Sequence, residues 1–206
     1  MNDNPTPVCD LYNTISRVSE GLYKEKGSRF LSFAYPVSDK EETDGILRKV
    51  KKEFFDARHC CFAFRLGPEG NEVRTCDDGE PSYSAGKPIL GQILSNDLSD
   101  ILIVVVRYFG GTKLGLPGLT KAYRTAAANA IKNADIIKKY ICRIYTIDFG
   151  YGNIDSVLKA LGQLNIIPYD RKFDLRCSIK ADVRLSLIEK FRESISMIDG
   201  ANIKEQ

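Results

Sequence analysis

Segment 77–88, DDGEPSYSAGKP, places three carboxylates, Asp77, Asp78 and Glu80, within four residues of a turn that contains glycine and proline. Carboxylates this close together could bind a hard cation such as Mg²⁺ or carry out acid–base chemistry. Alternatively, they pair with cations elsewhere in the chain and accept hydrogen bonds from neighbouring backbone N–H groups, and we favour this structural interpretation. The candidate cations are Lys87, Arg107 and Lys113.

A second candidate is the glycine-rich segment 107–115, RYFGGTKLG, which follows the apolar run ILIVVV at 101–106 and precedes a helix. A loop between a strand and a helix can present backbone N–H groups and the positive end of the helix dipole to an anion. Lys113, Lys121 and Arg124 would add positive charge. The glycine spacing fits neither nucleotide-binding fingerprint. It therefore indicates either an anion site or a turn that needs positive φ and close packing.

His59 is the only histidine, and Cys61 lies two residues further along the same expected strand face. Such a pair lacks the third group that would align a nucleophile with its base, so His59 either lines a site or packs in a strand. Residues 82–84, SYS, have no histidine near them in the sequence, which gives hydrolase chemistry no local support. The six cysteines include no C-x-x-C pair, and we expect free, reduced thiols.

The elements that must position these residues follow from the apolar spacing. Residues 17–37 alternate as two strands of a hairpin joined through KEKGSR, and Ser38 with Glu41 predicts a capping box that opens an amphipathic helix. The other expected elements are a strand at 59–66, a short strand at 72–75, a short helix at 89–97, a central strand at 101–106 buried on both faces, and an alanine-rich helix up to residue 134 that packs close to the sheet.

A second unit begins around KNADIIKKY. Its expected elements are a strand at 142–149, a helix over 154–164, a strand from 166, a strand over 173–180, a helix capped by Asp182, and a last strand at ANIKE. This order is typical of a small ferredoxin-like domain. We therefore predict a flexible N-terminus over residues 1–15, one domain over 16–138 and a second over 139–206.

The overall composition is that of an ordinary globular protein. Of 206 residues, 43% are hydrophobic, and 30 basic side chains stand against 27 acidic ones, so charge alone does not indicate a nucleic-acid partner. No apolar run reaches the roughly 20 residues of a membrane-spanning helix. The N-terminal MNDNPTPVCD lacks the features of a secretory signal. We expect a cytoplasmic protein with no membrane partner.

Taken together, four segments resemble the YigZ/IMPACT family: KGSRFLSFAYPV, RHCCFAFRLG, DDGEPSYSAGKPIL and VVVRYFGGTKLGLPGLTKAYRTAA. The resemblance implies an α+β protein with two domains. The N-terminal one would be a left-handed βαβ domain similar to a ribosomal-protein and elongation-factor domain, which departs from the usual right-handed crossover. The C-terminal one would be the small ferredoxin-like domain of the bacterial YigZ branch.

The resemblance also implies a function. In eukaryotes the IMPACT branch restrains the amino-acid-starvation kinase pathway by competing for the kinase's activator protein, and bacterial members are suggested to bind nucleic acid or ribosomes. We therefore expect a non-enzymatic, translation-associated regulator that binds RNA, the ribosome or a protein partner, with no cofactor. The alternative is a small-molecule or phosphate-ligand enzyme, with Mg²⁺ as its candidate ion, built on the acidic and glycine-rich turns.

The expected ligand- or partner-binding residues lie in these motifs and in the helix after them. They are His59, Asp77, Asp78, Glu80, Lys87, Arg107, Tyr108, Gly110, Gly111, Lys113, Lys121 and Arg124. Two departures from the family pattern affect this site. Tyr83 and Ser84 stand where glycine and threonine are usual, so a tyrosine could offer a stacking surface. Pro117 stands where glycine is usual and removes one N–H donor from any anion cradle.

Overall fold

The computed structural model describes residues 10–206. The chain forms two compact units: Tyr12–Lys139, and Tyr140–Gln206 together with the described residues before Tyr12. Each unit combines a β-sheet with helices, so the predicted α+β class with two domains is confirmed. No helix within residues 10–206 is both long enough and apolar enough to cross a membrane.

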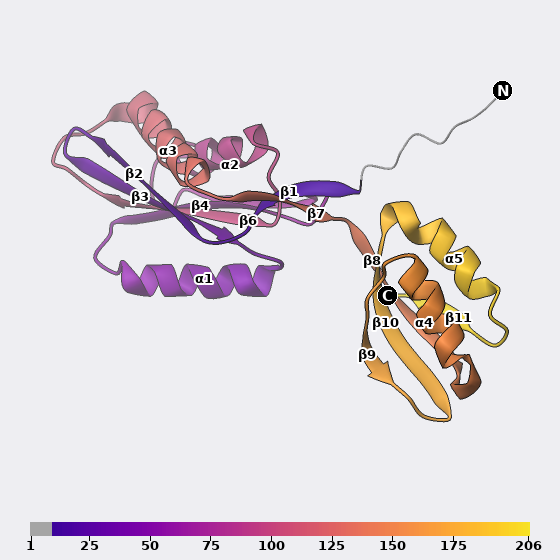
Figure 1. The fold of residues 1–206 in the computed structure, drawn as a ribbon. Coiled ribbons are helices and arrows are strands. Elements are labelled where there is room, and N and C mark those ends of the chain that lie inside the picture. The colour runs from indigo at the N-terminus through magenta and orange to yellow at the C-terminus, as the bar shows by residue number, and fades with distance from the viewer. Residues whose placement is uncertain (1–9) are drawn as a thin grey trace, which may run out of the picture. The chain divides into compact units, whose positions relative to one another are not determined.

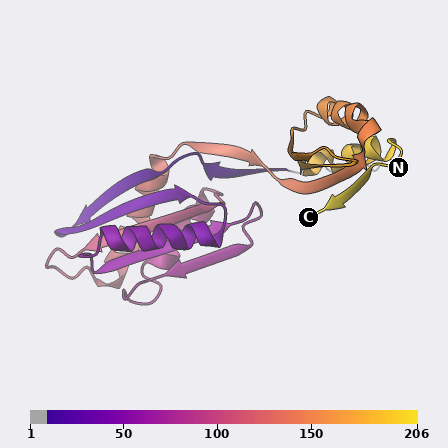
Figure 2. The ribbon, with the colours of Figure 1, turned by 90° about the horizontal axis from the view of Figure 1, so that it is seen from below.

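The first unit contains a five-stranded sheet in the order β2-β3-β6-β4-β5 (Figures 1 and 2). All neighbouring strands in it are antiparallel. Its central strand β6 is buried from Ile101 to Arg107, which explains the continuous apolar run in the sequence. The strand bounds are β2 Ser19–Glu25, β3 Ser28–Pro36, β4 His59–Leu66, β5 Glu72–Cys76 and β6 Ile101–Tyr108.

Helices cover both faces of this sheet. Helix α1 (Lys40–Glu53) packs on one face, and α2 (Gly86–Ser95) and α3 (Gly115–Lys132) pack on the other (Figure 1). The alanine stripe of α3 lets the helix approach the hairpin closely. Hydroxyl groups of Ser32 and Ser19 donate to the carbonyls of Ala126 and Ala130 at 2.7 and 2.9 Å. The predicted close packing of this helix is therefore confirmed.

The start of α1 differs by one residue from the expected capping box. The N-cap is Asp39 and not Ser38, and the Asp39 carboxylate accepts from the Glu42 N–H at 2.8 Å. Glu42 in turn accepts from the Ser38 N–H at 2.9 Å. The carboxylates of Asp39 and Glu42 thus take the roles expected of Ser38 and Glu41, because Asp caps a helix as well as Ser does.

Two strands outside the main sheet were not predicted. Strands β1 (Leu11–Ile15) and β7 (Ile136–Tyr140) pair with each other. The Ser16 N–H donates to the Asp135 carbonyl at 3.0 Å near one end of this ribbon. Residues 11–15 are thus a strand, which corrects the expected flexible segment 1–15; residues 1–9 lie outside the described part of the chain. Strand β7 also runs across the expected boundary between residues 138 and 139.

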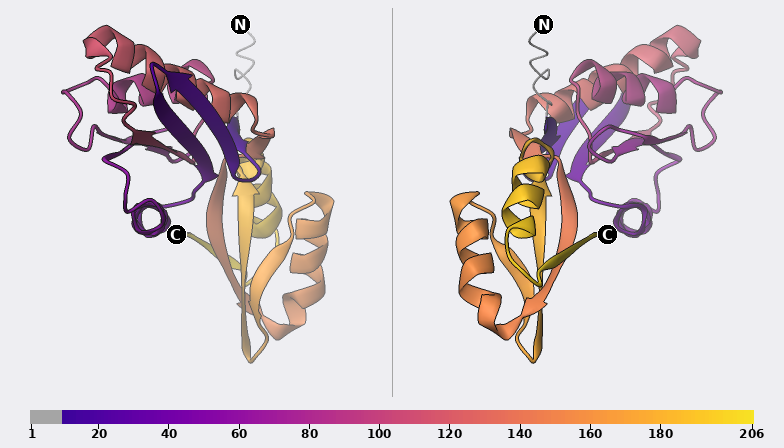
Figure 3. Two further views of the ribbon diagram at one scale, coloured as in Figure 1. Left: turned by 90° about the vertical axis from the view of Figure 1, so that its left-hand side faces the viewer. Right: turned by 90° about the vertical axis from the view of Figure 1, so that its right-hand side faces the viewer.

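The second unit follows the predicted β-α-β-β-α-β order (Figures 1 and 3). Its sheet has the order β11-β8-β10-β9, the arrangement of a ferredoxin-like domain, and α4 and α5 pack on one face of it. The bounds are β8 Cys142–Gly150, α4 Ile154–Gln163, β9 Pro168–Lys172, β10 Arg176–Arg184, α5 Ile188–Ser196 and β11 Asn202–Glu205.

The predicted helix cap at Asp182 is wrong. Asp182 lies within β10, where its carboxylate accepts from the Tyr169 hydroxyl at 2.7 Å. The strand continues to Arg184, and α5 begins only at Ile188, after a 3₁₀ turn. The alternation of buried and open side chains along β10 extends further than the apolar spacing suggested, because Ala181 and Val183 are also buried against the helices.

Candidate functional site

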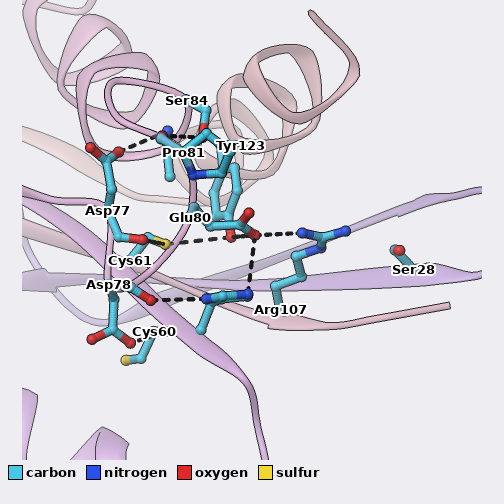
Figure 4. A network of polar contacts seen from close by, with 12 residues as sticks. Ser28, Cys60, Cys61, Asp77, Asp78, Glu80, Pro81, Ser84, Arg107 and Tyr123 are labelled. Carbon is cyan, nitrogen blue, oxygen red and sulfur yellow. Dashed lines mark hydrogen bonds and ion pairs between the residues drawn. The ribbon is translucent and has the colours of Figure 1, made fainter. Parts of the chain in front are cut away.

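The site is built on two adjacent strands of the first unit. His59 of β4 pairs directly with Arg107 of β6, so both side chains lie on the face of the sheet that α2 and α3 cover. The loop after β5 carries the DDGEP sequence over these two residues (Figure 4). The acidic turn and the strand that leads into the glycine-rich loop therefore meet, although 27 positions separate Glu80 from Arg107.

Glu80 is the centre of a buried polar cluster. One carboxylate oxygen, Oε1, accepts from Arg107 Nη1 at 2.5 Å and from the Tyr123 hydroxyl of α3 at 2.8 Å. The three residues are 9%, 6% and 0% exposed, so water does not screen these contacts. Removing one partner from such a cluster leaves a buried group without compensation, which is strongly destabilising.

His59 lies beside this cluster with a defined proton position. Its Nδ1 is 2.9 Å from the carbonyl oxygen of Asp78. Because a carbonyl only accepts, Nδ1 carries a proton, and Nε2 points toward Glu80 Oε1 at 3.8 Å. The ring is held by the backbone of the acidic turn, and its Nε2 edge lies among the cluster residues.

The other two carboxylates of the acidic turn stabilise local structure. Asp77 accepts from the N–H groups of Tyr83, Ala85 and Gly86 at 2.8 to 3.0 Å, at the start of α2. Asp78 accepts from the Cys60 N–H at 2.7 Å and from Lys51 Nζ at 3.0 Å. Figure 4 shows these two side chains directed away from Glu80. Within residues 10–206, no three His, Cys, Asp or Glu side chains are grouped so that they could hold a metal ion.

The thiol and phenol next to the cluster are not activated. Burial raises the pKa of the Cys61 thiol and of the Tyr123 hydroxyl far above their ordinary values. Cys61 Sγ donates to the carbonyl oxygen of Asp77 at 3.0 Å. A thiol that remains protonated is a poor nucleophile. The cluster therefore offers hydrogen bonds and charge, but its one thiol is held in the unreactive form.

The glycine-rich loop is fixed by a backbone contact with the hairpin between β2 and β3. A Cβ at Gly110 would lie 1.9 Å from the carbonyl carbon of Gly27, and the Gly110 N–H donates to the Ser28 hydroxyl at 3.1 Å. Gly111 and Gly115 have φ of +85° and +70°, a conformation that favours glycine. These glycines thus meet the needs of close packing and positive φ, and the KGSR and RYFGG motifs meet in space.

A cavity of about 420 Å³ opens where the acidic turn and the glycine-rich loop meet. It brings together four of the predicted site residues, His59, Glu80, Arg107 and Lys113, and the first turn of α3. The remaining lining residues are Arg58, Gly79, Pro81, Phe109, Leu114, Gly115, Leu116 and Leu119.

A second hollow of about 510 Å³ lies beside it between α2 and α3, and it holds two other predicted residues, Lys87 and Arg124. Tyr83 also lines it, and Lys87 Nζ lies 3.9 Å from the centre of the Tyr83 ring. One face of the proposed stacking surface is thus occupied by an ammonium group. The ring is 65% exposed, so it remains open to a partner.

Six predicted site residues line neither of these two hollows. The Asp77 and Asp78 carboxylates accept the hydrogen bonds described above and so hold the acidic turn in place. The Tyr108 hydroxyl donates to the Asp56 carboxylate at 2.8 Å. Lys121 is exposed on α3. Gly110 and Gly111 shape the loop through their backbones.

Sequence reasoning missed several residues of the site. Tyr123 was not among the expected site residues, although a hydroxyl on the buried face of an alanine-rich helix signals a buried partner. Arg58 is the first residue of the RHCCFAFRLG motif, Phe109 belongs to the glycine-rich segment, and Leu116 directly follows that segment. Their positions at the ends of elements gave no periodic signal.

Comparison with known proteins identifies the family. The Impact N-terminal domain matches residues 26–131, which is half of the chain and includes both motif-bearing turns. The chain belongs to the IMPACT family. IMPACT family member YvyE of Bacillus subtilis (strain 168) is 32% identical over 151 residues, which cover 72% of this chain and 70% of YvyE.

IMPACT family member YigZ of Escherichia coli (strain K12) is 34% identical over 140 residues, 67% of this chain and 69% of YigZ. A crystal structure of a hypothetical protein, 26% identical, superposes with a TM-score of 0.74 and covers 95% of this chain and 97% of its own. That structural likeness spans both units. The YigZ/IMPACT resemblance of the sequence is thereby confirmed.

Proposed function

We propose that this IMPACT family protein is a non-enzymatic, translation-associated regulator that acts by binding RNA of the ribosome. Family membership supports the translation-associated role, because the resemblance to this family implies translational control. RNA is the partner that the charged residues of the first unit favour over a protein partner.

The observation that carries this proposal is a division among the charged residues of the site. The buried carboxylate and arginine satisfy each other, whereas the cations around the two hollows make no ion pair with any described residue. Those cations are Arg58, Lys87, Lys113, Lys121 and Arg124. Unpaired cations next to half-open aromatic rings, here Phe109 and Tyr83, are the combination that binds a single-stranded phosphate backbone and its bases.

The test measures binding of the full chain to ribosomal RNA at two salt concentrations. Each phosphate contact lowers the slope of log affinity against log salt by about 0.7 for a single strand. Lys121→Gln on α3 is expected to weaken binding and reduce that slope by about one contact. The matched control is Lys49→Gln, an exposed lysine on α1, which packs on the opposite face of the sheet.

Equal effects of the two substitutions would contradict the assignment of this face. Affinity that does not change with salt would contradict RNA binding altogether, and capture of a protein in place of RNA would show that the partner is of the other kind.

A further inference from the structure

We propose that the cavity at the start of α3 binds the phosphomonoester of a nucleoside, either a nucleoside 5′-monophosphate or the 5′-phosphorylated end of an RNA chain. This inference deepens the proposed function. It rests on that function only where the ligand is the 5′ end of an RNA chain, and not where it is a free nucleotide. The phosphate would lie against the first turn of α3, and the ring would lie against the apolar wall of the cavity.

The first observation is that the N-terminus of α3 has no cap from the protein itself. The helix spans 18 residues, yet its N-cap residue Leu114 provides no side-chain hydrogen bond, and its first turn has no acidic residue. The first N–H groups of a helix have no partner within the helix and carry the positive end of its dipole. Pro117 lacks one of these groups, which leaves the N–H groups of Leu114, Gly115 and Leu116.

The second, independent observation is an orphan donor on Arg107. Its side chain is 8% exposed, and Nη1 bonds to Glu80, but Nε has no hydrogen-bond partner among the described residues. The edge of a guanidinium formed by Nε and Nη2 matches two oxygens of a phosphate. A buried donor without an acceptor costs free energy. Arg107 lines the cavity, and an oxyanion there would supply the acceptor once the guanidinium turns its covered Nε toward the cavity.

The charges in the cavity favour an anion. Its lining contains three cations, Arg58, Arg107 and Lys113, against one carboxylate, Glu80, which leaves a formal charge of +2 with neutral His59. Since Glu80 already accepts two hydrogen bonds, its charge is largely compensated. The arrangement brings donors from the helix, the strand and the loop to one anion with several oxygens, as a phosphate has.

The rest of the lining selects what the phosphate is attached to. Pro81, Phe109, Leu116 and Leu119 give the cavity an apolar wall. The Phe109 ring is 49% exposed and lies 5.6 Å from the Arg107 guanidinium, so one ring face is open at the rim. A volume of about 420 Å³ lies in the range of small-ligand sites. A nucleobase stacked against this wall would use both the apolar lining and the open face of the Phe109 ring.

The experiment titrates the full chain with matched probes and follows thermal stability and heat of binding. The probes are inorganic phosphate, uridine with uridine 5′-monophosphate, and one RNA decamer with a 5′-phosphate or a 5′-hydroxyl. We expect the phosphorylated member of each pair to bind roughly tenfold tighter or more, the gain typical of charge-assisted hydrogen bonds. Equal affinity within both pairs would overturn the proposal.

Two variants locate the site. Lys113→Gln, in the loop, is expected to reduce the preference for phosphate roughly tenfold. Leu116→Glu places a carboxylate in the first turn of α3, where it stabilises the helix while occupying the anion site. This variant is therefore expected to lose the phosphate preference and to keep its thermal stability. The matched control, Leu94→Glu, changes an equally open leucine (50% against 53% exposed) that lies outside the cavity.

The outcomes separate this inference from the proposed function. RNA binding that ignores the 5′-phosphate, with no response to uridine 5′-monophosphate, would leave the function standing and overturn the cavity assignment. Binding of uridine 5′-monophosphate that Leu116→Glu abolishes, without retention of ribosomal RNA, would support the cavity and contradict the function. A phosphate preference that survives Leu116→Glu would overturn the cavity assignment.

Discussion

Arg107 and Glu80 form an ion pair of 2.5 Å inside the first unit, with both side chains less than 10% exposed. Arg107 lies one position before the end of the central strand and Glu80 lies in the loop after β5, so the pair joins two segments that are distant in the sequence. We expect the loss of one partner from this buried pair to lower the free energy of unfolding more than the same loss in an exposed pair.

Glu80→Ala is expected to destabilise the protein by about 3 to 5 kcal/mol, because Arg107 loses its buried partner. Adding Arg107→Met to this variant is expected to recover part of the loss, since the uncompensated charge is then removed. The free energy of unfolding in urea measures both effects. The control is Asp135→Ala in the exposed pair with Arg17, for which we expect less than about 1 kcal/mol. Comparable losses in the two pairs would contradict the role of burial.

Gly110→Ala is expected to detach the glycine-rich loop from the hairpin. A Cβ there would lie 1.9 Å from backbone atoms of Gly27, which no side-chain movement can relieve. Loss of stability by roughly 1 to 3 kcal/mol would follow from such overpacking. The same change at Gly91, within α2 and with open space around it, is expected to stabilise by about 0.5 to 1 kcal/mol. The melting temperature is expected to fall for Gly110→Ala and to rise for Gly91→Ala, relative to the parent protein. Equal shifts in the two variants would contradict this prediction.

Stability is expected to fall at alkaline pH through Cys60. Burial, and then the charge of Asp78, raises the pKa of this thiol from 9.0 to about 11. The folded protein therefore retains a proton that the unfolded chain releases. The buried, protonated Cys60 thiol therefore makes its full contribution to the free energy of unfolding below pH 9. This free energy falls by on the order of 2 kcal/mol as the pH rises toward 11.

The measurement for Cys60 compares the unfolding free energy of the parent protein with that of Cys60→Ala at several pH values. The difference between them is expected to shrink from pH 8.5 to 11. Other groups titrate in both proteins and cancel. A difference that is constant over this range would contradict the raised pKa of Cys60.

Alkylation should separate the cysteines by burial. Cys142 is exposed, whereas Cys60 and Cys61 are buried, and the pKa of all three thiols is raised. With iodoacetamide at pH 8, peptide mapping is expected to show Cys142 modified at least tenfold faster than either buried thiol, because the reagent reaches its thiolate without opening of the fold. A denatured sample is the control, in which the three rates should converge. Fast labelling of Cys61 in the folded protein would contradict the unreactive site described above.

Most of the element order could be predicted from the sequence because each long strand and helix carries its own apolar period. The central strand at 101–106 and the alanine stripe of α3 are examples. Strands β1 and β7 could not, since they are short and lie outside the five-stranded sheet. Local competition between capping residues explains the Ser38 error, and Asp182 was misread because a polar residue on the open face of β10 resembles a helix start.

The sequence could predict several residues of the candidate site, but it could not predict which of them contact one another. The acidic and basic turns can be recognised from their composition. The hydrogen bonds from Arg107 and Tyr123 to the Glu80 carboxylate cannot, because the three residues come from elements that meet only in the folded protein. For the same reason, Asp77 could not be distinguished from Glu80 in the sequence, although one caps a helix and the other lies buried in the cluster.

The pairing of His59 with Arg107 links the site to the register between β4 and β6. Side chains alternate between the two faces of a strand, so a slip of one residue would turn His59 toward the layer of α1 and remove it from Arg107. The same slip would place Cys60 and Phe62 among the alanines of α3. Correct alignment of the two central strands and an intact site are therefore a single property, and a misaligned sheet would lack the cavity altogether.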